Sequence, residues 1–320
     1  MVKRKLGKAG LDVAPLAFGG NVFGWTADEE ISFKLLDAFV AAGFNLIDTA
    51  NSYSHWVPGN KGGESETIIG NWLRQRPGVR AKVLIATKVG SEMGPGESGL
   101  SKSYIVAEVE RSLRRLNTDY IDLYQSHRDD PKTPVDETLE AYGQLVRQGK
   151  VRVIGASNFT AARLAASLKS SAARGLPRYE SLQPEYNLYT RDRFEGELAD
   201  LCRNEQIGVI PYFSLASGFL TGKYRSEADF GKSPRGQRMH SMLNARGRRI
   251  LAALDEVGRE TNATPAQVSL AWLLAHGVTA PIASATSVEQ LNELTQGATL
   301  ELTRDAVAAL DEASAAGLEE

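Results

Sequence analysis

Three apolar runs of the sequence end on ionisable side chains, and a tyrosine follows one of them. Asp48 closes the first run, Lys88 the second and His127 the third. Tyr53 lies five residues beyond Asp48 in a polar segment. An acid, a cation, an imidazole and a phenol are groups that move protons to and from a reacting oxygen. If the four side chains meet at one place, they predict general acid–base catalysis.

Tyr53 is the residue whose chemistry depends most on its neighbours. A free phenol has a pKa of about 10 and is a poor acid at neutral pH. An adjacent ammonium favours the phenolate, so we expect Lys88 to lower the pKa of Tyr53 and to make Tyr53 a general acid. Asp48 would keep Lys88 charged, because an unpaired buried ammonium tends to lose its proton. His127 would direct a ring N–H at the substrate oxygen and stabilise its negative charge.

These side chains meet only if the fold brings the ends of their strands together. Short β-rich apolar runs alternate with amphipathic helical patterns along the chain, which is typical of a parallel α/β sheet. Eight such strands, each followed by a helix, favour a (β/α)8 TIM barrel, in which the carboxyl ends of all strands surround one mouth. The predicted strands span residues 13–19, 45–49, 83–88, 121–127, 151–157, 181–184, 209–212 and 280–283.

Local patterns add detail to this barrel. Thr264 and Gln267 form a capping box around a proline, which predicts the start of a helix. Cys202 falls at helical spacing with apolar neighbours and is expected in the core. The basic residues 1–10 are expected to form a solvated β-hairpin ahead of the barrel. Residues 213–246 are the least regular stretch, and loops of that length are usually functional or disordered.

Composition restricts the class of protein. A chain of 320 residues with 42% hydrophobic and 24% charged residues and no linker predicts one domain over residues 1–320. A net charge of −2 makes nucleic acid an unexpected partner. Because no apolar run is long enough to cross a membrane, we expect no membrane association and a cytoplasmic protein. A single cysteine predicts a reducing compartment, and the chain is expected to be a monomer or a homo-oligomer.

The motifs around the four ionisable residues resemble those of the aldo-keto reductase superfamily. The resemblance covers nearly the whole chain, is of the bacterial type, and extends to the potassium-channel β-subunit-like branch. It implies that Asp48, Tyr53, Lys88 and His127 form the catalytic tetrad. The motifs are GFNLIDTA at 43–50 followed by Tyr53, ATK at 86–88, DLYQSH at 122–127 and IGASNF at 154–159.

The resemblance also implies an NAD(P)H cofactor across the barrel mouth and no metal ion. Ser157, Asn158 and Gln183 would hold the nicotinamide carboxamide, and Tyr212 would stack on its ring. NADPH is favoured and NADH remains possible, because Thr286 stands where many NADPH-preferring members carry a basic residue. The expected cofactor contacts are Gly20, Asn21, Asp48, Ser157, Asn158, Gln183, Tyr212, Ser214, Leu215, Gly218, Gly222, Lys223, Arg235, Ser284, Thr286, Gln290 and Glu293.

Two motifs have a competing interpretation. Residues 94–99 match the G-x-G-x-x-G pattern of dinucleotide-binding folds. The first glycine does not directly follow a strand, and no acidic residue ends the next strand at the ribose position, so we interpret the segment as a flexible loop at the rim. Lys88 could form a Schiff base in an aldolase, but Asp48 nearby would hold the amine protonated.

The function that these residues predict is NAD(P)H-dependent reduction of aldehydes or ketones to alcohols, and the reverse oxidation. The alternative is a slow, cofactor-binding regulatory subunit, because residues 214–223 also resemble those of potassium-channel β subunits. Trp25 and Trp56 predict an aromatic wall near Tyr53, which suits rings without selecting one substrate. The short segment after the last helical pattern predicts an open mouth and small carbonyl substrates.

Overall fold

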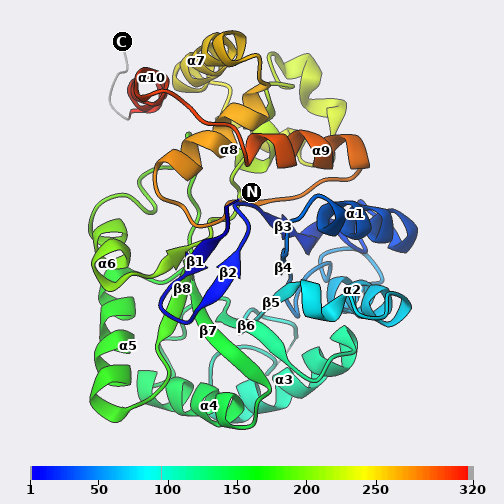
Figure 1. Ribbon diagram of the computed structural model, residues 1–320, viewed down its shortest axis with the longest axis vertical. Coiled ribbons are helices and arrows are strands. Elements are labelled where there is room, and N and C mark those ends of the chain that lie inside the picture. Colours follow the sequence, from blue (N-terminus) through cyan, green and yellow to red (C-terminus); the bar gives the residue numbers. More distant parts are fainter. Residues whose placement is uncertain (1, 95, 316–320) are drawn as a thin grey trace.

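Figure 1 shows a computed structural model of the chain, which describes residues 2–94 and 96–315. One sheet contains eight strands in the order β10-β3-β4-β5-β6-β7-β8-β9, and all of its pairings are parallel. The strands are β3 (Ala17–Gly19), β4 (Leu46–Asp48), β5 (Leu84–Val89), β6 (Ile121–Ser126), β7 (Val151–Ser157), β8 (Tyr179–Gln183), β9 (Gly208–Val209) and β10 (Ile282–Ala283).

Backbone hydrogen bonds between the two ends of this sheet close it into a barrel. The amide of Thr279 donates to the carbonyl of Val209 at 2.8 Å, and the amide of Ile282 donates to that of Pro211 at 2.9 Å. A closed barrel leaves no unpaired sheet edge. The predicted (β/α)8 fold is therefore confirmed, with every predicted strand represented.

Helices follow the strands and form a ring around the barrel (Figure 1). Their ends carry the expected signals, since Thr264 and Gln267 form the predicted capping box at the start of α8. The helices are α1 (Glu29–Ala41), α2 (Glu64–Gln75), α3 (Lys102–Leu116), α4 (Val135–Arg147), α5 (Ala161–Arg174), α6 (Glu197–Glu205), α7 (Ala245–Thr261), α8 (Pro265–Ala275), α9 (Val288–Gly297) and α10 (Arg304–Ser314).

Helix α8 differs from its neighbours because it is apolar on all sides. Trp272 and Leu273 of this helix are fully buried, as are residues on every other face of its middle turns. A helix that is hydrophobic all round must be covered on its outer side as well. Helices α7 and α10 provide that cover, since both contact α8 and pack against each other (Figure 1).

The hydrophobic core has two layers, one on each side of the barrel wall. The larger layer lies between the strands and the helices and includes Cys202, as predicted, and burial raises the pKa of this thiol to about 12. The smaller layer fills the inside of the barrel, where Leu46, Ala86, Leu123 and Val153 alternate with the polar residues described below. The interior is thus packed, and chemistry is left to the ends of the strands.

An N-terminal β-hairpin closes the amino-terminal end of the barrel, as predicted. Strands β1 (Arg4–Leu6) and β2 (Leu11–Val13) pair antiparallel, and Leu6 joins the inner core layer. The predicted strand at 13–19 was wrong in its first part, because Val13 belongs to the hairpin. Asn45 fixes this hairpin to the barrel, since its side chain accepts from the amide of Ala14 at 2.9 Å and donates to the carbonyl of Asp12 at 2.8 Å.

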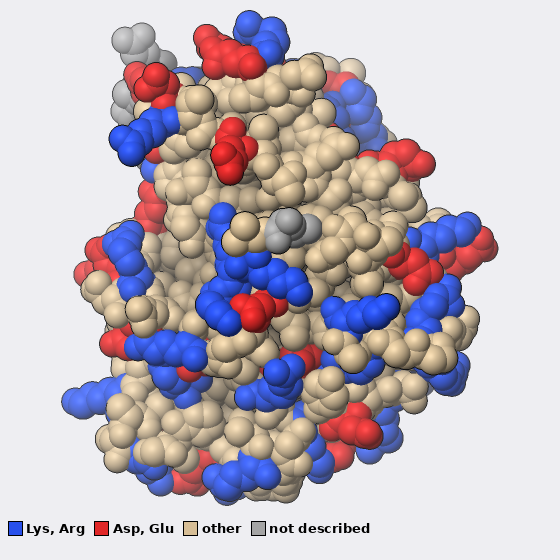
Figure 2. Space-filling model, viewed as in Figure 1, with Lys and Arg blue, Asp and Glu red and all other residues tan. Residues whose placement is uncertain are grey.

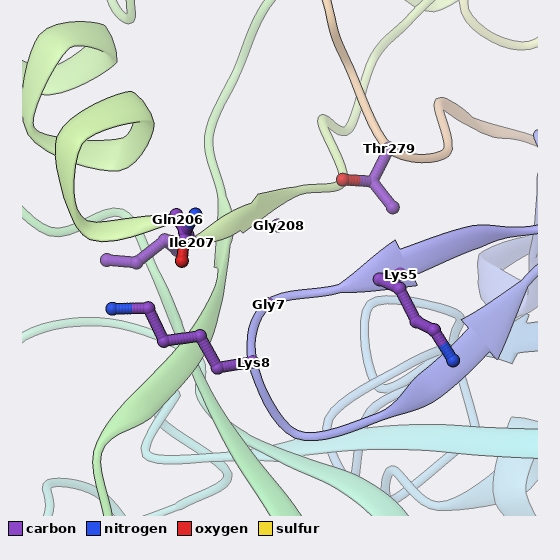
Figure 3. Close-up of a pocket in the computed structure, with 7 residues that line it drawn as sticks. All are labelled: Lys5, Gly7, Lys8, Gln206, Ile207, Gly208 and Thr279. Atoms are coloured by element: carbon purple, nitrogen blue, oxygen red, sulfur yellow. The ribbon is translucent and has the colours of Figure 1, made fainter.

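The hairpin face carries a small group of basic side chains at its centre, with acidic groups beside them (Figure 2). Lys5 pairs with Asp12 at 2.8 Å, while Arg4 is half-buried and donates to the carbonyl of Val278 at 2.6 Å. A hollow lies beside the hairpin turn, and the Lys8 side chain extends towards Gln206 and Ile207, which directly precede β9 (Figure 3). This hollow lies at the amino ends of the strands, opposite to Asp48 and Lys88.

Candidate active site

The four predicted catalytic residues meet at the carboxyl ends of β4, β5 and β6. Asp48 is the last residue of β4, Lys88 lies near the end of β5, and both side chains are almost completely buried. The Lys88 ammonium donates to Asp48 Oδ2 at 2.7 Å and to the hydroxyl of Tyr53 at 2.8 Å. The ring of Tyr53 lies 6.0 Å from that of His127, edge to face. The structure therefore brings together the set that strand ends predicted.

Lys88 has an acceptor for each of its three N–H groups. Besides Asp48 and Tyr53, it donates to the backbone carbonyl of Thr49 at 2.8 Å. Burial lowers the pKa of Lys88, and Asp48 opposes that change. Three acceptors within hydrogen-bond distance match an ammonium, which has three donors and no lone pair. This arrangement argues against a Schiff-base nucleophile, which needs the neutral amine.

The pKa of Tyr53 differs from the prediction. We expected Lys88 to lower it, but burial and then the negative charge of Asp48 raise it well above the usual value of 10.0. The physical reason is that burial disfavours the phenolate and that Asp48 lies close to the hydroxyl, at 3.4 Å. Tyr53 therefore holds its proton at neutral pH, which is the form that a proton donor requires.

Two glutamines position Asp48 from the other side. Gln125 Nε2 donates to Asp48 Oδ1 at 3.1 Å, and Gln183 Nε2 donates to the same oxygen at 2.9 Å. Sequence reasoning gave Gln125 no role. The alternation of side chains within β6 could have identified Gln125 as a site residue. Leu123 faces the inner core, and Gln125 and His127 follow on the same face of the strand.

His127 directly follows β6, and its main chain is fixed on both sides. Its amide donates to the carbonyl of Val89 at 2.8 Å, and its carbonyl accepts from Asn158 Nδ2 at 3.0 Å. Burial, followed by the charges of Lys88 and Arg128, lowers the pKa of His127 well below 6.5. The imidazole is therefore neutral at pH 7. Its Nδ1 is buried and has no hydrogen-bond partner among the described residues.

Aromatic rings extend from Tyr53 towards the rim. The ring of Trp56 lies 6.2 Å from Tyr53, and that of Trp25 lies 5.7 Å from Trp56. Trp56 is one of the few large apolar side chains that are exposed in the described chain, at 44%. The guanidinium of Arg235 covers Trp25 at 4.9 Å. The predicted aromatic wall is thus present.

The residues predicted to hold the nicotinamide lie side by side at the ends of β7, β8 and β9. Tyr212 donates to Asn158 Oδ1 at 2.8 Å, and Ser157 donates to the carbonyl of Gln183 at 2.8 Å. Asn158 has a φ of 57°, which is rare for a residue other than glycine and is tolerated best by asparagine. The structure thus places the side chains of Ser157, Asn158 and Tyr212 together, whereas the amide of Gln183 is directed at Asp48 and Gln125.

The irregular segment 213–246 contains three short 3-10 helices, η3 (Ala216–Thr221), η4 (Glu227–Lys232) and η5 (Gly236–Ser241). Its first part has several left-handed backbones in succession, including Ala216 at 47°, Ser217 at 57° and Gly218 at 100°. Such strain concentrates at functional sites. A Cβ on Gly218 would lie 3.5 Å from Lys223 Nζ, so the ammonium rests against bare backbone there.

The remaining predicted cofactor residues lie at several places along the rim. Arg235 Nη2 donates to Asn21 Oδ1 at 2.8 Å, in the amide orientation in which Asn21 donates to Ser284 Oγ at 2.7 Å. The amide and the hydroxyl of Thr286 both donate to Gln290 Oε1, at 2.9 and 3.1 Å. The others, by location, are Gly20 at the start of η1 (Gly20–Val22), Ser214, Leu215 and Gly222 around η3, and half-buried Glu293 on α9.

The G-x-G-x-x-G segment ends before helix α3 begins. The amide of Met93 donates to the carbonyl of Glu97 at 2.9 Å, and α3 begins only at Lys102. Residue 95 lies outside the described residues. A phosphate site of the dinucleotide type needs the helix to begin within the motif, so the geometry agrees with a rim loop.

A closed (β/α)8 barrel with a lysine–aspartate pair, a tyrosine and a histidine at one mouth defines a class of proteins that carry out proton-coupled chemistry on small molecules. Among the described residues, no group of three or more acidic, histidine or cysteine side chains could hold a metal ion. None of the described helices is long and apolar enough to cross a membrane.

Comparison with known proteins places the chain within this class. Residues 15–315 match the aldo/keto reductase family. The chain is 36% identical to the uncharacterized oxidoreductase YrpG of Bacillus subtilis, over 96% of this chain and 94% of that protein. It is 34% identical to the aldo-keto reductase AFTS1 of Alternaria alternata, over 95% of this chain and 89% of that protein.

A third relative carries a different kind of name. The chain is 32% identical to a probable voltage-gated potassium channel subunit beta of Arabidopsis thaliana, over 92% of this chain and 90% of that protein.

The 320-residue chain itself belongs to the aldo/keto reductase family. It is accordingly an oxidoreductase of a kind that generally uses NAD(P)H, and the predicted resemblance is confirmed.

Proposed function

We propose that the protein reduces aldehydes or ketones to alcohols, using hydride from NAD(P)H and a proton from Tyr53. The observation that carries this proposal is the contact of 2.8 Å between the Lys88 ammonium and the Tyr53 hydroxyl. The Tyr53 oxygen accepts from Lys88, and its own proton, which is held by Asp48 Oδ2 only through a long hydrogen bond of 3.4 Å, is the one given to the substrate. When bound, the cofactor supplies the hydride that adds to the carbonyl carbon.

Each residue of the tetrad has one task in this mechanism. Tyr53 gives its proton to the carbonyl oxygen as negative charge develops there, and an alkoxide is a far stronger base than a phenolate. The ammonium of Lys88 stabilises the phenolate that Tyr53 becomes, and Asp48 holds Lys88 in place. Neutral His127 donates a ring N–H to the same substrate oxygen and fixes its position.

We propose NADPH as the preferred cofactor. The donor set fits a dinucleotide, because Lys223 beside the bare backbone of Gly218 and the nearby Arg235 suit phosphate oxygens, while Asn158 and Tyr212 suit an amide-bearing ring. Thr286 contributes hydrogen bonds but no charge to a 2′-phosphate, so the preference is expected to be modest. Initial rates with NADPH and NADH at equal concentrations measure it.

The test of the mechanism is the Tyr53→Phe variant. We expect kcat with nitrobenzaldehyde or methylglyoxal to fall by about 100- to 10,000-fold, because the general acid is lost. The dissociation constant for NADPH should stay within about threefold of wild type, since the ring remains. Tyr120→Phe is the matched control, because Tyr120 lies at the amino end of β6 and should leave both quantities unchanged. Equal losses of NADPH binding and turnover in Tyr53→Phe would contradict the role of Tyr53.

The same assay separates a second candidate function. The potassium channel subunit among the relatives favours a regulatory protein that binds NADPH and turns over slowly. If NADPH quenches the tryptophan fluorescence of the protein but none of the carbonyl compounds is reduced, the regulatory function replaces the reductase.

A further inference from the structure

An unpaired cation stands at the rim next to the proposed catalytic histidine. Arg128 follows His127 directly, at the point where β6 has ended, and its side chain is exposed. It has no hydrogen-bond or ion-pair partner within residues 2–94 and 96–315. Arg174, by contrast, is an exposed arginine that is paired, with Glu140 at 2.6 Å.

The two acidic residues that follow Arg128 do not neutralise it, because both are engaged elsewhere. Asp129 pairs with Arg163 at 2.6 Å. Asp130 accepts from the hydroxyl of Thr133 at 2.6 Å and from the amide of Leu100 at 2.9 Å. The guanidinium of Arg128 is therefore left with its charge and its two-pronged donor edge available to a ligand.

The position of Arg128 is set by the contacts of the neighbouring site residues. Asn158 binds the carbonyl of His127 with its amide nitrogen and the hydroxyl of Tyr212 with its amide oxygen, so these residues form a row that starts at His127, next to Arg128 in the chain. The charge of Arg128 acts on both rings. Burial lowers the pKa of His127, and Lys88 and then Arg128 lower it further; burial and Glu185 raise the pKa of Tyr212, and Arg128 opposes that rise.

We propose that Arg128 binds the carboxylate of substrates that carry both a carbonyl and a carboxylate group. The carbonyl oxygen would lie at Tyr53 and His127, and the carboxylate would pair with Arg128 at the rim. The planar guanidinium matches the two oxygens of a carboxylate. The aromatic rings of Trp25 and Trp56 accommodate a ring between the two groups. This inference rests on the proposed reductase function and adds the substrate class.

The first test compares a charged substrate with its neutral ester. Wild type is assayed with 4-carboxybenzaldehyde and with methyl 4-formylbenzoate, which differ in the charge far from the aldehyde. We expect kcat/KM to favour the carboxylate by about 10-fold or more, and the Arg128→Gln variant to lose most of that ratio, since a charge-assisted pair contributes a factor of this order. The quantity compared is the ratio of kcat/KM for the two substrates. Any effect of the substitution on His127 cancels in this ratio, because both substrates are reduced at the same aldehyde group.

Arg193→Gln is the matched control. Arg193 is also exposed, and its charge also opposes the rise in the pKa of Tyr212 that burial and Glu185 cause, but it is not adjacent to His127. If a direct pair with Arg128 is responsible, Arg193→Gln keeps the preference for the carboxylate. If both variants lose the preference for the carboxylate equally, the overall positive charge of the rim favours the carboxylate, not a direct pair with Arg128. That result would overturn the proposal. A wild-type enzyme that favours the ester, or an Arg128→Gln variant that keeps the preference, would also overturn it.

A binding measurement keeps this inference separate from the reductase function. The product analogue 4-(hydroxymethyl)benzoate is titrated into wild type and Arg128→Gln, each saturated with NADP+, by calorimetry. We expect the dissociation constant to rise about 10-fold or more in the variant. If wild type reduces no aldehyde but shows this difference, the reductase proposal fails and the carboxylate site stands. If aldehydes are reduced and both proteins bind the analogue equally, the carboxylate site fails and the reductase stands.

Discussion

At the scale of single residues, the site is governed by one buried ion pair. Lys88 and Asp48 are 0% and 1% exposed, and the carbonyl of Thr49 and the amides of Gln125 and Gln183 bond to one or the other. Burying two charges is costly, and the cost is offset only when each charge keeps its partner. The pair is therefore better understood as a device for holding Tyr53 than as a source of stability.

Removing one partner of this pair should destabilise the protein. Lys88→Met keeps the length of the side chain but leaves the Asp48 carboxylate buried without a cation. We expect the free energy of unfolding to fall by about 3 to 5 kcal/mol, measured by urea denaturation. The control is Lys34→Met, because Lys34 pairs with Glu30 on the surface and should show no measurable change. A loss below about 1 kcal/mol would mean that the glutamine amides alone satisfy Asp48.

The pH dependence of stability should report His127. Its pKa is lowered in the folded protein, mainly by burial, so the unfolded chain takes up a proton as pH falls through about 6.5 while the folded protein does not. Wild type therefore loses stability below that pH, and His127→Asn lacks this loss. The stability of wild type minus that of the variant should shrink by up to about 1.4 kcal/mol per pH unit below about pH 6.5. Denaturation curves for both proteins between about pH 5 and 7.5 test this, and a constant difference would contradict it.

At the scale of elements, glycine permits the strands to pack around the polar layer. Gly155 lies in β7 opposite Gln125 of β6 and Ser181 of β8. A Cβ at Gly155 would lie 2.2 Å from Ser181 Oγ and 3.1 Å from Gln125 Cγ. Any side chain there would push Gln125, and through Gln125 it would move Asp48. The glycine thus fixes the spacing of the site from within the barrel.

Gly155→Ala tests this packing. We expect the free energy of unfolding to fall by about 1 to 3 kcal/mol, because the added methyl group overpacks a closed barrel. Gly231→Ala in η4 is the control, since nothing lies within 4 Å of a Cβ there. Adding Ser181→Ala should recover part of the stability, because it removes the clashing hydroxyl. A double variant as unstable as the sum of the single variants would contradict this explanation.

At the scale of the whole molecule, the barrel separates stability from chemistry by placing them at opposite ends. The hairpin and the inner apolar layer close the amino-terminal end, while Asp48, Tyr53, Lys88 and His127 lie at the other end. Barrels of this kind tolerate variation in the loops after their strands because the packed end does not depend on those loops. The hollow beside the hairpin (Figure 3) belongs to the packed end.

This separation predicts that stability can be lost without loss of catalysis. Leu6 is fully buried in the inner core layer, so Leu6→Ala should lower the free energy of unfolding by about 2 to 5 kcal/mol. At a temperature where the variant remains folded, kcat and KM should equal those of wild type. Val2→Ala serves as the control, because Val2 is 84% exposed. A change in KM with Leu6→Ala would show that the hairpin influences the mouth.

The sequence by itself determined the order of the strands and the membership of the catalytic site. Strands and helices follow from local periodicity, and Asp48, Lys88 and His127 could be recognised because each closes a strand, and strand ends meet in a barrel. One strand was wrong in part because the prediction followed the apolar character of residues 13–19 and passed over Pro15, the local signal that separates the hairpin from β3.

Only the tertiary structure decided the electrostatics and the long-range partners. The pKa of Tyr53 rises rather than falls because burial and the distance to Asp48 outweigh the nearby cation, and neither quantity is local. The amides of Gln125 and Gln183 meet Asp48 across 77 and 135 residues of chain, and Arg235 reaches Asn21 from a different loop. Arg128 is available for the same reason, because its neighbours Asp129 and Asp130 find partners in other elements. Which charges remain unpaired depends on contacts between distant segments, and those exist only after folding.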